Sequence, residues 1–438
     1  MTLPQGEMKT TPYWWDAAPV RPLPEKPLER TVDVAIVGAG YTGLTAGLTL
    51  ARAGRSVAVF DRQHPGEGAS SRNGGITSGN IRLDHQTLIH KFGEARALAI
   101  ETEGKLAREH LYTLLEEEGI DCDFQLAGRY SCAIGAEDYE QMARNAEKLH
   151  RNLGIEAYAV PQSKQRDYIG SDFFCGGMVR MDIGGLHPAK FIAELLRVVQ
   201  SAGVVVHANT AVMKIDRDGD AFIVRTSRGQ LRSRQVLICT NGYTDNVDPW
   251  LRRRLVPVRS RIIATEELPT DLMDKLMPRR MMLSDKRILG FYFRPSPDGK
   301  RILFGGRDGT YNNDPTEPVA YLRKNLLQIF PELQDTRISH TWFGNVAMHR
   351  DMIPRIFTRN DIVYATGFCG SGVVWAPWIG QRAALKLLEN EPESPSAFDF
   401  RAPPSIPLYR GKPWFMPFFM AMYRAQDRRK MRRAGREE

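Results

Sequence analysis

The stretch Val32-Asp-Val-Ala-Ile-Val37, continued by Gly38-Ala-Gly-Tyr-Thr-Gly43, decides the fold that this 438-residue sequence predicts. Its opening run is apolar and rich in β-branched residues, which is typical of a buried parallel strand. Small helix-forming residues fill positions 44–53, and a second apolar run, Ser56-Val-Ala-Val-Phe60, follows them. A strand, a turn, a helix and a second strand within about 30 residues predict one compact βαβ unit.

Three glycines and one acid give this unit the pattern of a dinucleotide-binding turn. Gly38 permits the tight turn, Gly40 lets the backbone approach a pyrophosphate, and Gly43 allows close packing of helix and strand. The start of the helix offers free N–H groups and a positive dipole to the phosphates. Asp61, which closes the second strand 18 residues after Gly43, is expected to accept hydrogen bonds from the adenosine ribose.

Two further glycine-rich segments favour FAD over NAD as the dinucleotide. Gly66-Glu-Gly-Ala-Ser-Ser-Arg-Asn-Gly-Gly75 lies just past the acid, where it can fold over the pyrophosphate and reach the flavin. A plain surface loop is the alternative interpretation of that segment. Gly367-Phe-Cys-Gly-Ser-Gly372 follows a predicted strand and precedes a helix expected from Pro377 to Leu388. Its backbone N–H groups are placed to stabilise negative charge on a reduced flavin.

Size and composition describe an ordinary globular protein with no membrane span. At 438 residues, 42% hydrophobic and 25% charged, the chain is expected to fold as two packed domains. No apolar run reaches the roughly 18–20 residues that cross a bilayer, and residues 1–30 are too polar and proline-rich for a secretory signal. The five cysteines are dispersed, as reduced thiols are, and neither they nor the nine histidines show a metal-ligand spacing. We therefore expect a cytoplasmic protein without a metal.

The end of the chain combines an apolar segment with a basic one. Residues 414–423 read Trp-Phe-Met-Pro-Phe-Phe-Met-Ala-Met-Tyr, and from Arg424 to Glu438 seven basic residues face three acids, a net +4 out of the chain's +9. The preferred interpretation is a segment that packs on the protein or on a partner subunit and ends in a solvated, frayed helix. Peripheral contact with anionic lipid is the alternative. The sequence has no recognition helix and no interleaving of basic and aromatic residues, so it does not predict nucleic-acid binding.

The three glycine segments together resemble those of the D-amino-acid-oxidase-like family of FAD-dependent oxidoreductases, and most closely those of its γ-glutamylputrescine oxidase branch. The similarity follows the family order across nearly the whole chain. The matching pieces are Thr11-Pro-Tyr-Trp-Trp15, Val37-Gly-Ala-Gly-Tyr-Thr-Gly-Leu44, Gly68-Ala-Ser-Ser-Arg-Asn-Gly-Gly75, Gly185-Leu-His-Pro188, Cys239-Thr-Asn-Gly-Tyr-Thr244, Leu303-Phe-Gly-Gly-Arg307, Gly367-Phe-Cys-Gly-Ser-Gly-Val373 and Tyr409-Arg-Gly-Lys-Pro-Trp414.

The resemblance implies an α/β fold in which a Rossmann-like FAD-binding domain is interleaved with an α+β substrate domain. The antiparallel sheet of the substrate domain is expected to cover the flavin. The expected segments are an N-terminal extension at 1–30, an FAD-binding domain at 31–95, 176–255 and 343–390, a substrate domain at 96–175 and 256–342, and a C-terminal tail at 391–438.

The resemblance also implies which residues hold FAD, among them Val212, which would meet the adenine through its backbone. The expected cofactor-binding residues are Gly38, Gly40, Tyr41, Thr42, Gly43, Asp61, Arg62, Ser70, Ser71, Arg72, Asn73, Gly74, Val212, Thr240, Asn241, Gly242, Gly367, Gly370, Ser371, Gly372, Val373 and Val374. Several relatives tether the flavin through His or Cys. The loop here reads Ser-Ser-Arg-Asn and Cys369 is expected to pack, so a noncovalent cofactor is predicted.

One position departs from the family pattern. Relatives that oxidise D-amino acids carry an arginine that clamps the α-carboxylate, just after the glycine of a tryptophan–glycine strand. In Trp342-Phe-Gly-Asn-Val-Ala-Met-His349 the corresponding residue is Val346. A simple α-amino acid therefore loses its bidentate partner, which favours secondary or ω-amines as substrates.

Four residues are candidates for catalytic positions over the flavin: Tyr292 and Arg294 on the covering sheet, Arg307 after a Gly-Gly turn, and His349. Each has a competing structural interpretation, as a sheet aromatic, a paired arginine or a hydrogen-bonded core histidine. Amine oxidation by a flavin requires a neutral amine, while the protein supplies orientation, desolvation and electrostatics.

The leading hypothesis is the FAD-dependent oxidation of a secondary or γ-glutamylated amine, with oxygen or another electron acceptor as partner. The resulting imine would hydrolyse to an aldehyde and an amine or ammonia. An imino-acid or D-amino-acid oxidase with a relocated carboxylate clamp is one alternative. A flavin dehydrogenase that delivers electrons to a membrane quinone is another, and a non-catalytic nucleotide-binding sensor is a third that no motif supports.

Overall fold

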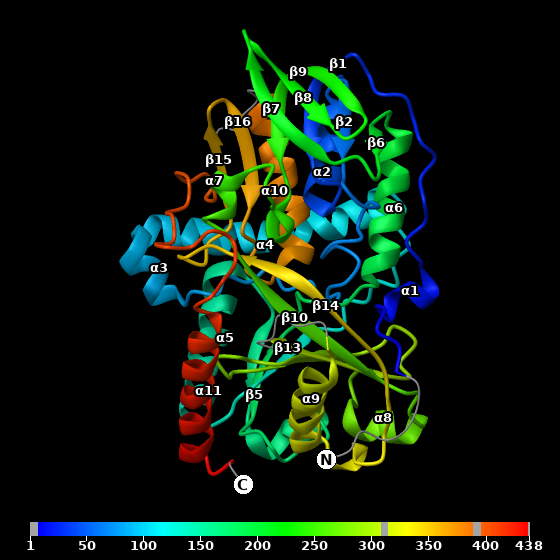
Figure 1. Ribbon diagram of the computed structural model, residues 1–438. Helices are drawn as coiled ribbons and strands as arrows, with labels where there is room; N and C mark the ends of the chain where they lie inside the picture. The colour runs from blue at the N-terminus through cyan, green and yellow to red at the C-terminus, as the bar shows by residue number, and fades with distance from the viewer. Residues whose placement is uncertain (1–7, 308–313, 389–395, 437–438) are drawn as a thin grey trace.

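The computed structural model describes residues 8–307, 314–388 and 396–436. It contains two sheets, and the first of them carries the βαβ unit (Figure 1). Strand β1 is parallel to both β2 and β9, so the predicted unit lies at the centre of this sheet. A hairpin, β7–β8, extends it through β9. The strand order is β15 (Arg355–Arg359), β16 (Ile362–Thr366), β9 (Gly229–Ile238), β1 (Thr31–Val37), β2 (Val57–Phe60) and β6 (Val205–His207), with β7 (Val212–Asp218) and β8 (Ala221–Thr226) in the hairpin.

The second sheet also has eight strands, and all its pairings except β11–β3 are antiparallel. The two strands on either side of residues 296–301 lie in its middle, where Tyr292 pairs with Gly305 across the turn. Together the sheets confirm the predicted α/β class. The strand order is β14 (Ile338–Met348), β10 (Val256–Thr265), β13 (Ile302–Arg307), β12 (Tyr292–Pro295), β11 (Met282–Asp285), β3 (Arg129–Cys132), β5 (Gly177–Arg180) and β4 (Ala157–Val160).

Helix α2 (Tyr41–Arg52) connects β1 to β2 and packs on α10 (Gly372–Leu387). The two helices touch at Gly380, where a Cβ would lie 2.4 Å from the carbonyl oxygen of Thr42. The other helices are α1 (Trp14–Ala17), α3 (His85–Phe92), α4 (Glu94–Glu117), α5 (Ala136–Leu153), α6 (Pro188–Ser201), α7 (Pro249–Arg252), α8 (Thr270–Leu276), α9 (Thr316–Ile329) and α11 (Met416–Arg433), with 3₁₀ turns at Gln162–Asp167, Asn241–Tyr243 and Pro331–Leu333.

The start of α10 corrects one prediction. The sequence predicted a helix from Pro377 to Leu388. The helix begins at Gly372 instead, and Pro377 lies inside it. Proline removes one backbone hydrogen bond at this point, and the same helix packs closely on α2. The third glycine segment therefore runs directly into the helix.

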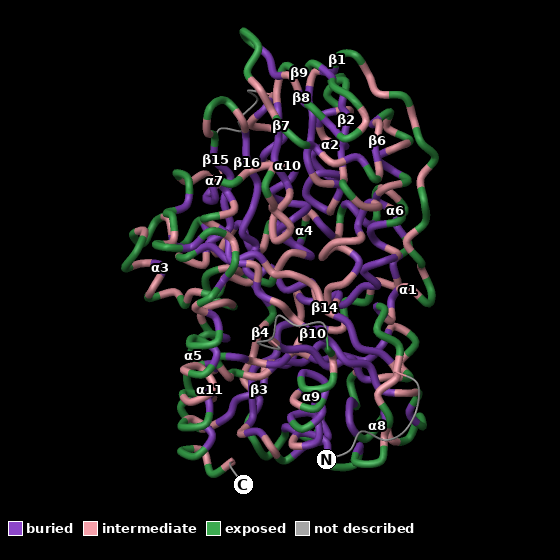
Figure 2. The backbone as a smooth tube through the Cα atoms, in the orientation of Figure 1, coloured by how far each residue is buried: buried purple, intermediate pink, exposed green. Residues whose placement is uncertain are grey.

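The sheets lie one above the other in Figure 1, and Figure 2 shows buried residues running through both. Three elements cross the segment limits expected from the sequence. Strand β5 belongs to the second sheet, β14 spans the limit at 342/343, and α4 packs on α10 beside the first sheet. The exact domain limits stay a prediction.

The C-terminal helix α11 lies along α5 (Figure 1). Met416, Met420 and Met431 are buried on one side of it, so the apolar segment packs on its own protein, whereas Trp414 and Phe418 remain 62% and 69% exposed. The basic end of the segment is helical to Arg433 rather than frayed. Among the described residues, no helix is long and apolar enough to cross a membrane.

Candidate functional site

The turn between β1 and α2 leaves no room for side chains at its glycines. Gly38 has φ +109°, and a Cβ there would lie 2.8 Å from the carbonyl oxygen of Cys239. A Cβ at Gly43 would lie 1.9 Å from the carbonyl oxygen of Gly38, and one at Gly40 would lie 2.9 Å from the hydroxyl oxygen of Ser70. Backbone atoms therefore form the surface of the turn, as the approach of a pyrophosphate requires.

Asp61 follows β2, and backbone donors hold its carboxylate. Oδ2 accepts a hydrogen bond from the N–H of Ala39 (2.9 Å), and Oδ1 accepts one from the N–H of Gln63 (3.0 Å). Burial raises the pKa of Asp61, and these two donors partly oppose the rise. The carboxylate lines the same cavity as Gly38 and Gly40, where the hydroxyls of a ribose could donate to it.

A cavity of about 770 Å³ extends from this turn to the second sheet and brings the three glycine segments together. Five of the expected cofactor-binding residues do not line it: Gly43, Ser71, Gly242, Gly367 and Val374. The expected residues that do line it are Gly38, Gly40, Tyr41, Thr42, Asp61, Arg62, Ser70, Arg72, Asn73, Gly74, Val212, Thr240, Asn241, Gly370, Ser371, Gly372 and Val373.

Indole N–H groups from two distant parts of the chain hold the second glycine segment in place. Nε1 of Trp14 donates to the carbonyl oxygen of Asn73 (2.9 Å), and Nε1 of Trp342 donates to that of Arg72 (2.8 Å). Both tryptophans are almost completely buried. The sequence showed both as family motif residues but gave no sign that they hold this loop.

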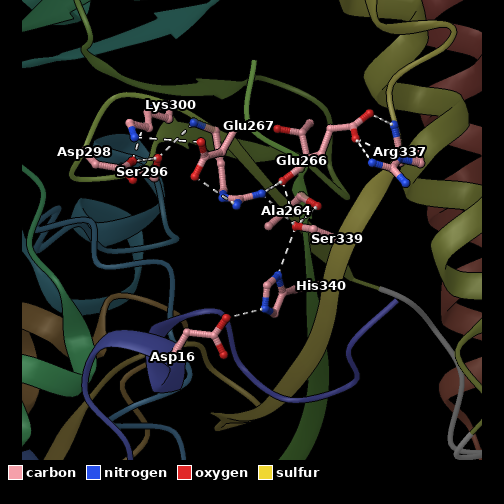
Figure 3. A network of polar contacts seen from close by, with 12 residues as sticks. Asp16, Ala264, Glu266, Glu267, Ser296, Asp298, Lys300, Arg337, Ser339 and His340 are labelled. Carbon is pink, nitrogen blue, oxygen red and sulfur yellow. Dashed lines mark hydrogen bonds and ion pairs between the residues drawn. The ribbon is translucent and has the colours of Figure 1, made fainter. Parts of the chain in front are cut away.

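Trp15 adds a third tie. Its Nε1 donates to Oγ of Ser71 (3.0 Å), so Ser71 binds the indole instead of lining the cavity, and the guanidinium of Arg72 lies 4.6 Å from the centre of the indole ring. The N-terminal segment is itself fastened to β14, because the carboxylate of Asp16 lies 3.0 Å from Nε2 of His340 (Figure 3).

Tyr292 forms part of the cavity wall on the side of the second sheet. Its hydroxyl lies 2.9 Å from Oγ of Ser260. Its ring fits against Gly74, where a Cβ would lie 2.8 Å from the ring. Burial raises the pKa of Tyr292 to about 12, so the phenol is protonated at neutral pH.

Two guanidinium groups enter the cavity near Tyr292. Arg82 donates from Nε to the carbonyl oxygen of Cys369 (2.9 Å), and its Nη2 would lie 3.8 Å from a Cβ on Gly370. Arg307 has no hydrogen bond or ion pair within the described ranges. Burial, and then the charge of Arg82, lowers the pKa of Arg307. The sequence singled out Arg307 but not Arg82, which no motif marked.

The other two catalytic candidates lie outside the cavity wall. Nη1 of Arg294 donates to the carbonyl oxygens of Leu186 (2.8 Å) and Gly75 (3.0 Å), so this arginine supports the second glycine segment from behind. His349 is 1% exposed, and its Nδ1 donates to the carbonyl oxygen of Ile353 (2.8 Å). Burial lowers the pKa of His349 to about 3, so the imidazole is neutral.

The third glycine turn is tied to the end of β9. Oδ1 of Asn241 accepts hydrogen bonds from the N–H of Gly367 (2.9 Å) and from Oγ1 of Thr366 (3.3 Å). The thiol of Cys369 donates to the carbonyl oxygen of Gly367 (3.0 Å). Burial raises the pKa of Cys369 to about 11. The glycine cradle, the oriented acid and this turn all fit the parts of an FAD molecule.

Comparisons with known proteins agree with this geometry. The family described as FAD dependent oxidoreductase matches residues 33–385. A probable oxidoreductase OrdL of Rhizobium meliloti is 30% identical over 95% of this chain and 97% of its own length. The gamma-glutamylputrescine oxidoreductase of Escherichia coli is 29% identical over 91% of this chain and 93% of its own. The crystal structure of glycine oxidase from Geobacillus kaustophilus has the same fold, with a TM-score of 0.72 at 20% identity over 85% of this chain and 98% of that one.

Proposed function

Because the chain belongs to the FAD-dependent oxidoreductase family, we propose that it oxidises the C–N bond of a secondary or γ-glutamylated amine. The imine formed would hydrolyse to an aldehyde and an amine or ammonia. The observation that carries the proposal is the single cavity that joins the dinucleotide turn to Tyr292 and Arg307. Bound FAD supplies the hydride acceptor for such a reaction.

Different residues around the cavity would bind the cofactor and act on the substrate. Gly38, Gly40 and Asp61 would hold the ADP part without side chains in the way, and the indole-held segment 68–74 would lie along the rest of the cofactor. The guanidinium groups of Arg82 and Arg307 disfavour the ammonium form of a bound amine, because like charges nearby lower the pKa of the amine. They also favour any negative charge that the cofactor gains.

Two observations support a γ-glutamylated or secondary amine over a simple amino acid. Val346, at the position where relatives carry the carboxylate-clamping arginine, lines the cavity and offers no hydrogen bond. A relative at 29% identity is named for the oxidation or reduction of gamma-glutamylputrescine.

Anaerobic titration of the purified holoprotein tests the proposal. Flavin absorbance should bleach with γ-glutamylputrescine or with a secondary amine that lacks an α-carboxylate, such as N-methylbutylamine, and steady-state turnover should follow the same order. Bleaching by D-alanine alone would overturn the preference for these amines. A protein that is colourless and takes up no added FAD would overturn the proposal altogether.

The placement of Arg82 favours an imino-acid or D-amino-acid oxidase as the second candidate. Both Nη2 of Arg82 and Cγ1 of Val346 would lie within 4 Å of a Cβ on Gly370, at 3.8 and 3.9 Å. Arg82 thus brings a guanidinium, from another part of the chain, to the neighbourhood of the missing clamp. Proline and D-alanine as substrates, each lost in Arg82→Gln, would favour this candidate.

The electron acceptor and the location complete the proposal. We propose oxygen as acceptor, with delivery to a membrane quinone as the alternative, for which the exposed Trp414 and Phe418 give the surface. Comparing turnover with oxygen and with an artificial acceptor separates the two. We propose the cytoplasm as location because all five cysteines are free thiols.

A further inference from the structure

The cavity continues past Tyr292 along the second sheet, and its far wall carries Arg129, Ser284 and Lys286. Ser284 pairs with Tyr292 on one side and with Ser131 on the other. Arg129 precedes Ser131 by two residues, and alternate residues of a strand share a face. Arg129, Ser284 and Tyr292 therefore lie on one face of the sheet, which looks into the cavity.

Arg129 is held in place but is not neutralised. Its Nε and Nη2 donate to Oγ of Ser284 at 3.1 and 2.5 Å. Burial, and then the charge of Arg180, lowers the pKa of Arg129 to about 10, so the guanidinium is charged at neutral pH. Arg180 has its own partner in Asp182 (2.7 Å). Within the described ranges, no carboxylate pairs with Arg129.

The acids at this end of the cavity already have partners. A carboxylate oxygen of Asp285 lies 2.6 Å from Nη2 of Arg287, and one of Asp138 lies 2.7 Å from Nζ of Lys430. Asp285 also accepts hydrogen bonds from backbone N–H groups of its own turn. The two remaining cations of the far wall, Arg129 and Lys286, form no ion pair among the described residues. Burial lowers the pKa of Lys286, and the charges of Asp138 and Asp84 partly oppose that effect.

The C-terminal helix α11 fixes the turn that carries the second of these cations, Lys286. Asp427 accepts hydrogen bonds from the N–H groups of Ile288 (2.7 Å) and Leu289 (3.0 Å), and Nζ of Lys430 donates to the carbonyl oxygen of Lys286 (2.8 Å). Nζ of Lys286 has no hydrogen bond or ion pair in the part of the chain that is described. Helix α11 lies beyond residues 33–385, which match the family.

The distance between the two ends of the cavity selects for the length of the substrate. Three strand spacings separate β3 from β13, and the strand register places Arg307 four residues further along the sheet than Arg129. The two backbones therefore lie about 14 Å apart across the sheet and about 13 Å apart along it, roughly 19 Å in all. An extended chain of about nine bonds spans ~10 Å, and the arginine side chains cover the rest. A short amino acid reaches only one end.

We propose that Arg129 and Lys286 form an anion subsite that binds a carboxylate at the far end of the substrate from the amine that is oxidised. The proposal rests on the proposed function and narrows its substrate class to extended amines that end in a carboxylate. Helix α11 positions the subsite by fixing the turn after β11.

A matched pair of probes tests the subsite: γ-glutamylputrescine and the same molecule with its carboxylate converted to a carboxamide. The wild-type holoprotein should have a kcat/KM about tenfold or more higher for the acid. Lys286→Gln should raise KM for the acid by about tenfold, leave kcat unchanged and not affect the amide. Arg129→Gln should act likewise, and Lys164→Gln, on an exposed side chain that does not line the cavity, is the matched control. Equal losses on both probes would overturn the subsite.

A binding measurement keeps the subsite separate from the proposed function. If neither probe is oxidised, the γ-glutamylated-amine proposal fails, and linear dicarboxylates from succinate to suberate are titrated into the holoprotein and followed by flavin absorbance. The subsite predicts that at least one of them binds and that Lys286→Gln weakens it about tenfold. No binding by the wild type, or the same affinity in Lys286→Gln, would overturn it.

Discussion

Arg307 lies beside Tyr292 in a cavity that also holds the guanidinium of Arg82. Because a positive charge lowers the pKa of a nearby amine, Arg307→Gln is expected to raise the pKa of the bound amine by about 1 unit. The rate of flavin reduction at saturating substrate, measured from neutral to alkaline pH, reports this pKa in its acidic limb. FAD content should stay unchanged.

Arg197 offers the control for that experiment. It lies on the surface of α6 and pairs with Glu194, so Arg197→Gln removes the same charge far from the cavity. The acidic limb of Arg197→Gln should coincide with that of the wild type. If the acidic limb of the pH profile of Arg307→Gln has the same pKa as that of the wild type, this arginine does not affect the pKa of the bound amine.

Cys369 bears on how the cofactor is held. Its thiol has a raised pKa of about 11 and donates to a backbone carbonyl, and a protonated thiol is a poor nucleophile. Acid precipitation of the protein should therefore release the flavin into the supernatant, and Cys369→Ser should bind as much FAD as the wild type. Yellow colour that stays with the washed pellet would contradict the noncovalent prediction.

At the residue scale, the sequence predicted the parts of the cavity wall that backbone atoms form, but not the parts that depend on where side chains point. Glycines at fixed spacing after a strand allow few conformations, so Gly38 and Gly40 were predictable. Arg82 was not, because its approach to the cavity depends on the path of a loop. Arg294 was placed over the flavin but binds backbone carbonyls instead.

At the scale of elements, helix α2 provides a matched pair of substitutions. Gly43→Ala puts a Cβ 1.9 Å from the carbonyl oxygen of Gly38, whereas at Gly47 the nearest atoms are 3.5 Å away, which is ordinary contact. Gly43→Ala should lose FAD binding or fail to fold. Gly47→Ala should bind FAD normally and gain up to about 1 kcal/mol from helix propensity. The flavin-to-protein absorbance ratio and a thermal melt distinguish them.

Helix α1 carries another prediction, because its Trp14 supplies one of the indole ties. Trp14→Phe keeps the ring packing but leaves the carbonyl oxygen of Asn73 without its donor, at a cost of about 1–3 kcal/mol. FAD affinity should fall by roughly tenfold or more. Isothermal titration of the apoprotein with FAD measures the change. Trp250→Phe, in α7, is the control; an equal loss there would remove the special role of α1.

Long helices with a clear sequence period were predictable, whereas helix boundaries that depend on tertiary packing were not. The stretches with a charged helical face or a clear apolar period form α4, α5 and α6. The start of α10 was placed late, because Pro377 is tolerated inside the helix by packing that sequence alone does not show.

At the scale of the whole molecule, two buried histidines make stability depend on pH. Burial lowers the pKa of His187 to about 4 and that of His349 to about 3. Since the unfolded value is about 6.5, the unfolded chain binds protons first as pH falls, so stability is full above about pH 6.5 and declines below it. The decline is up to about 1.4 kcal/mol per pH unit for each histidine.

Urea unfolding at neutral and mildly acidic pH measures this dependence. His349→Gln removes one titrating group, so the slope of its unfolding free energy against pH should be smaller than that of the wild type. His150→Gln, on the exposed side of α5, should leave the slope as it is. A His349→Gln slope equal to the wild-type slope would contradict the prediction.

The overall arrangement was predictable only in outline. The βαβ unit and the family pattern implied two interleaved parts, and both sheets are present. The order of the second sheet, with β3 parallel to β11 and β14 at the edge, depends on contacts between residues far apart in the chain. The same holds for the far wall of the cavity, which needs α11 against the turn that follows β11.

The indole ties have a consequence for how the protein is made. Trp14 emerges from the ribosome early, whereas Trp342, which grips the neighbouring residue of the same loop, emerges after more than three quarters of the chain. The loop along the dinucleotide can therefore close fully only after more than three quarters of the chain has been made, since domains generally assemble as units during translation. A nascent chain stalled before β14 would have a folded glycine turn at residues 38–43. It would bind the cofactor only weakly, because Trp342 would not yet hold the loop.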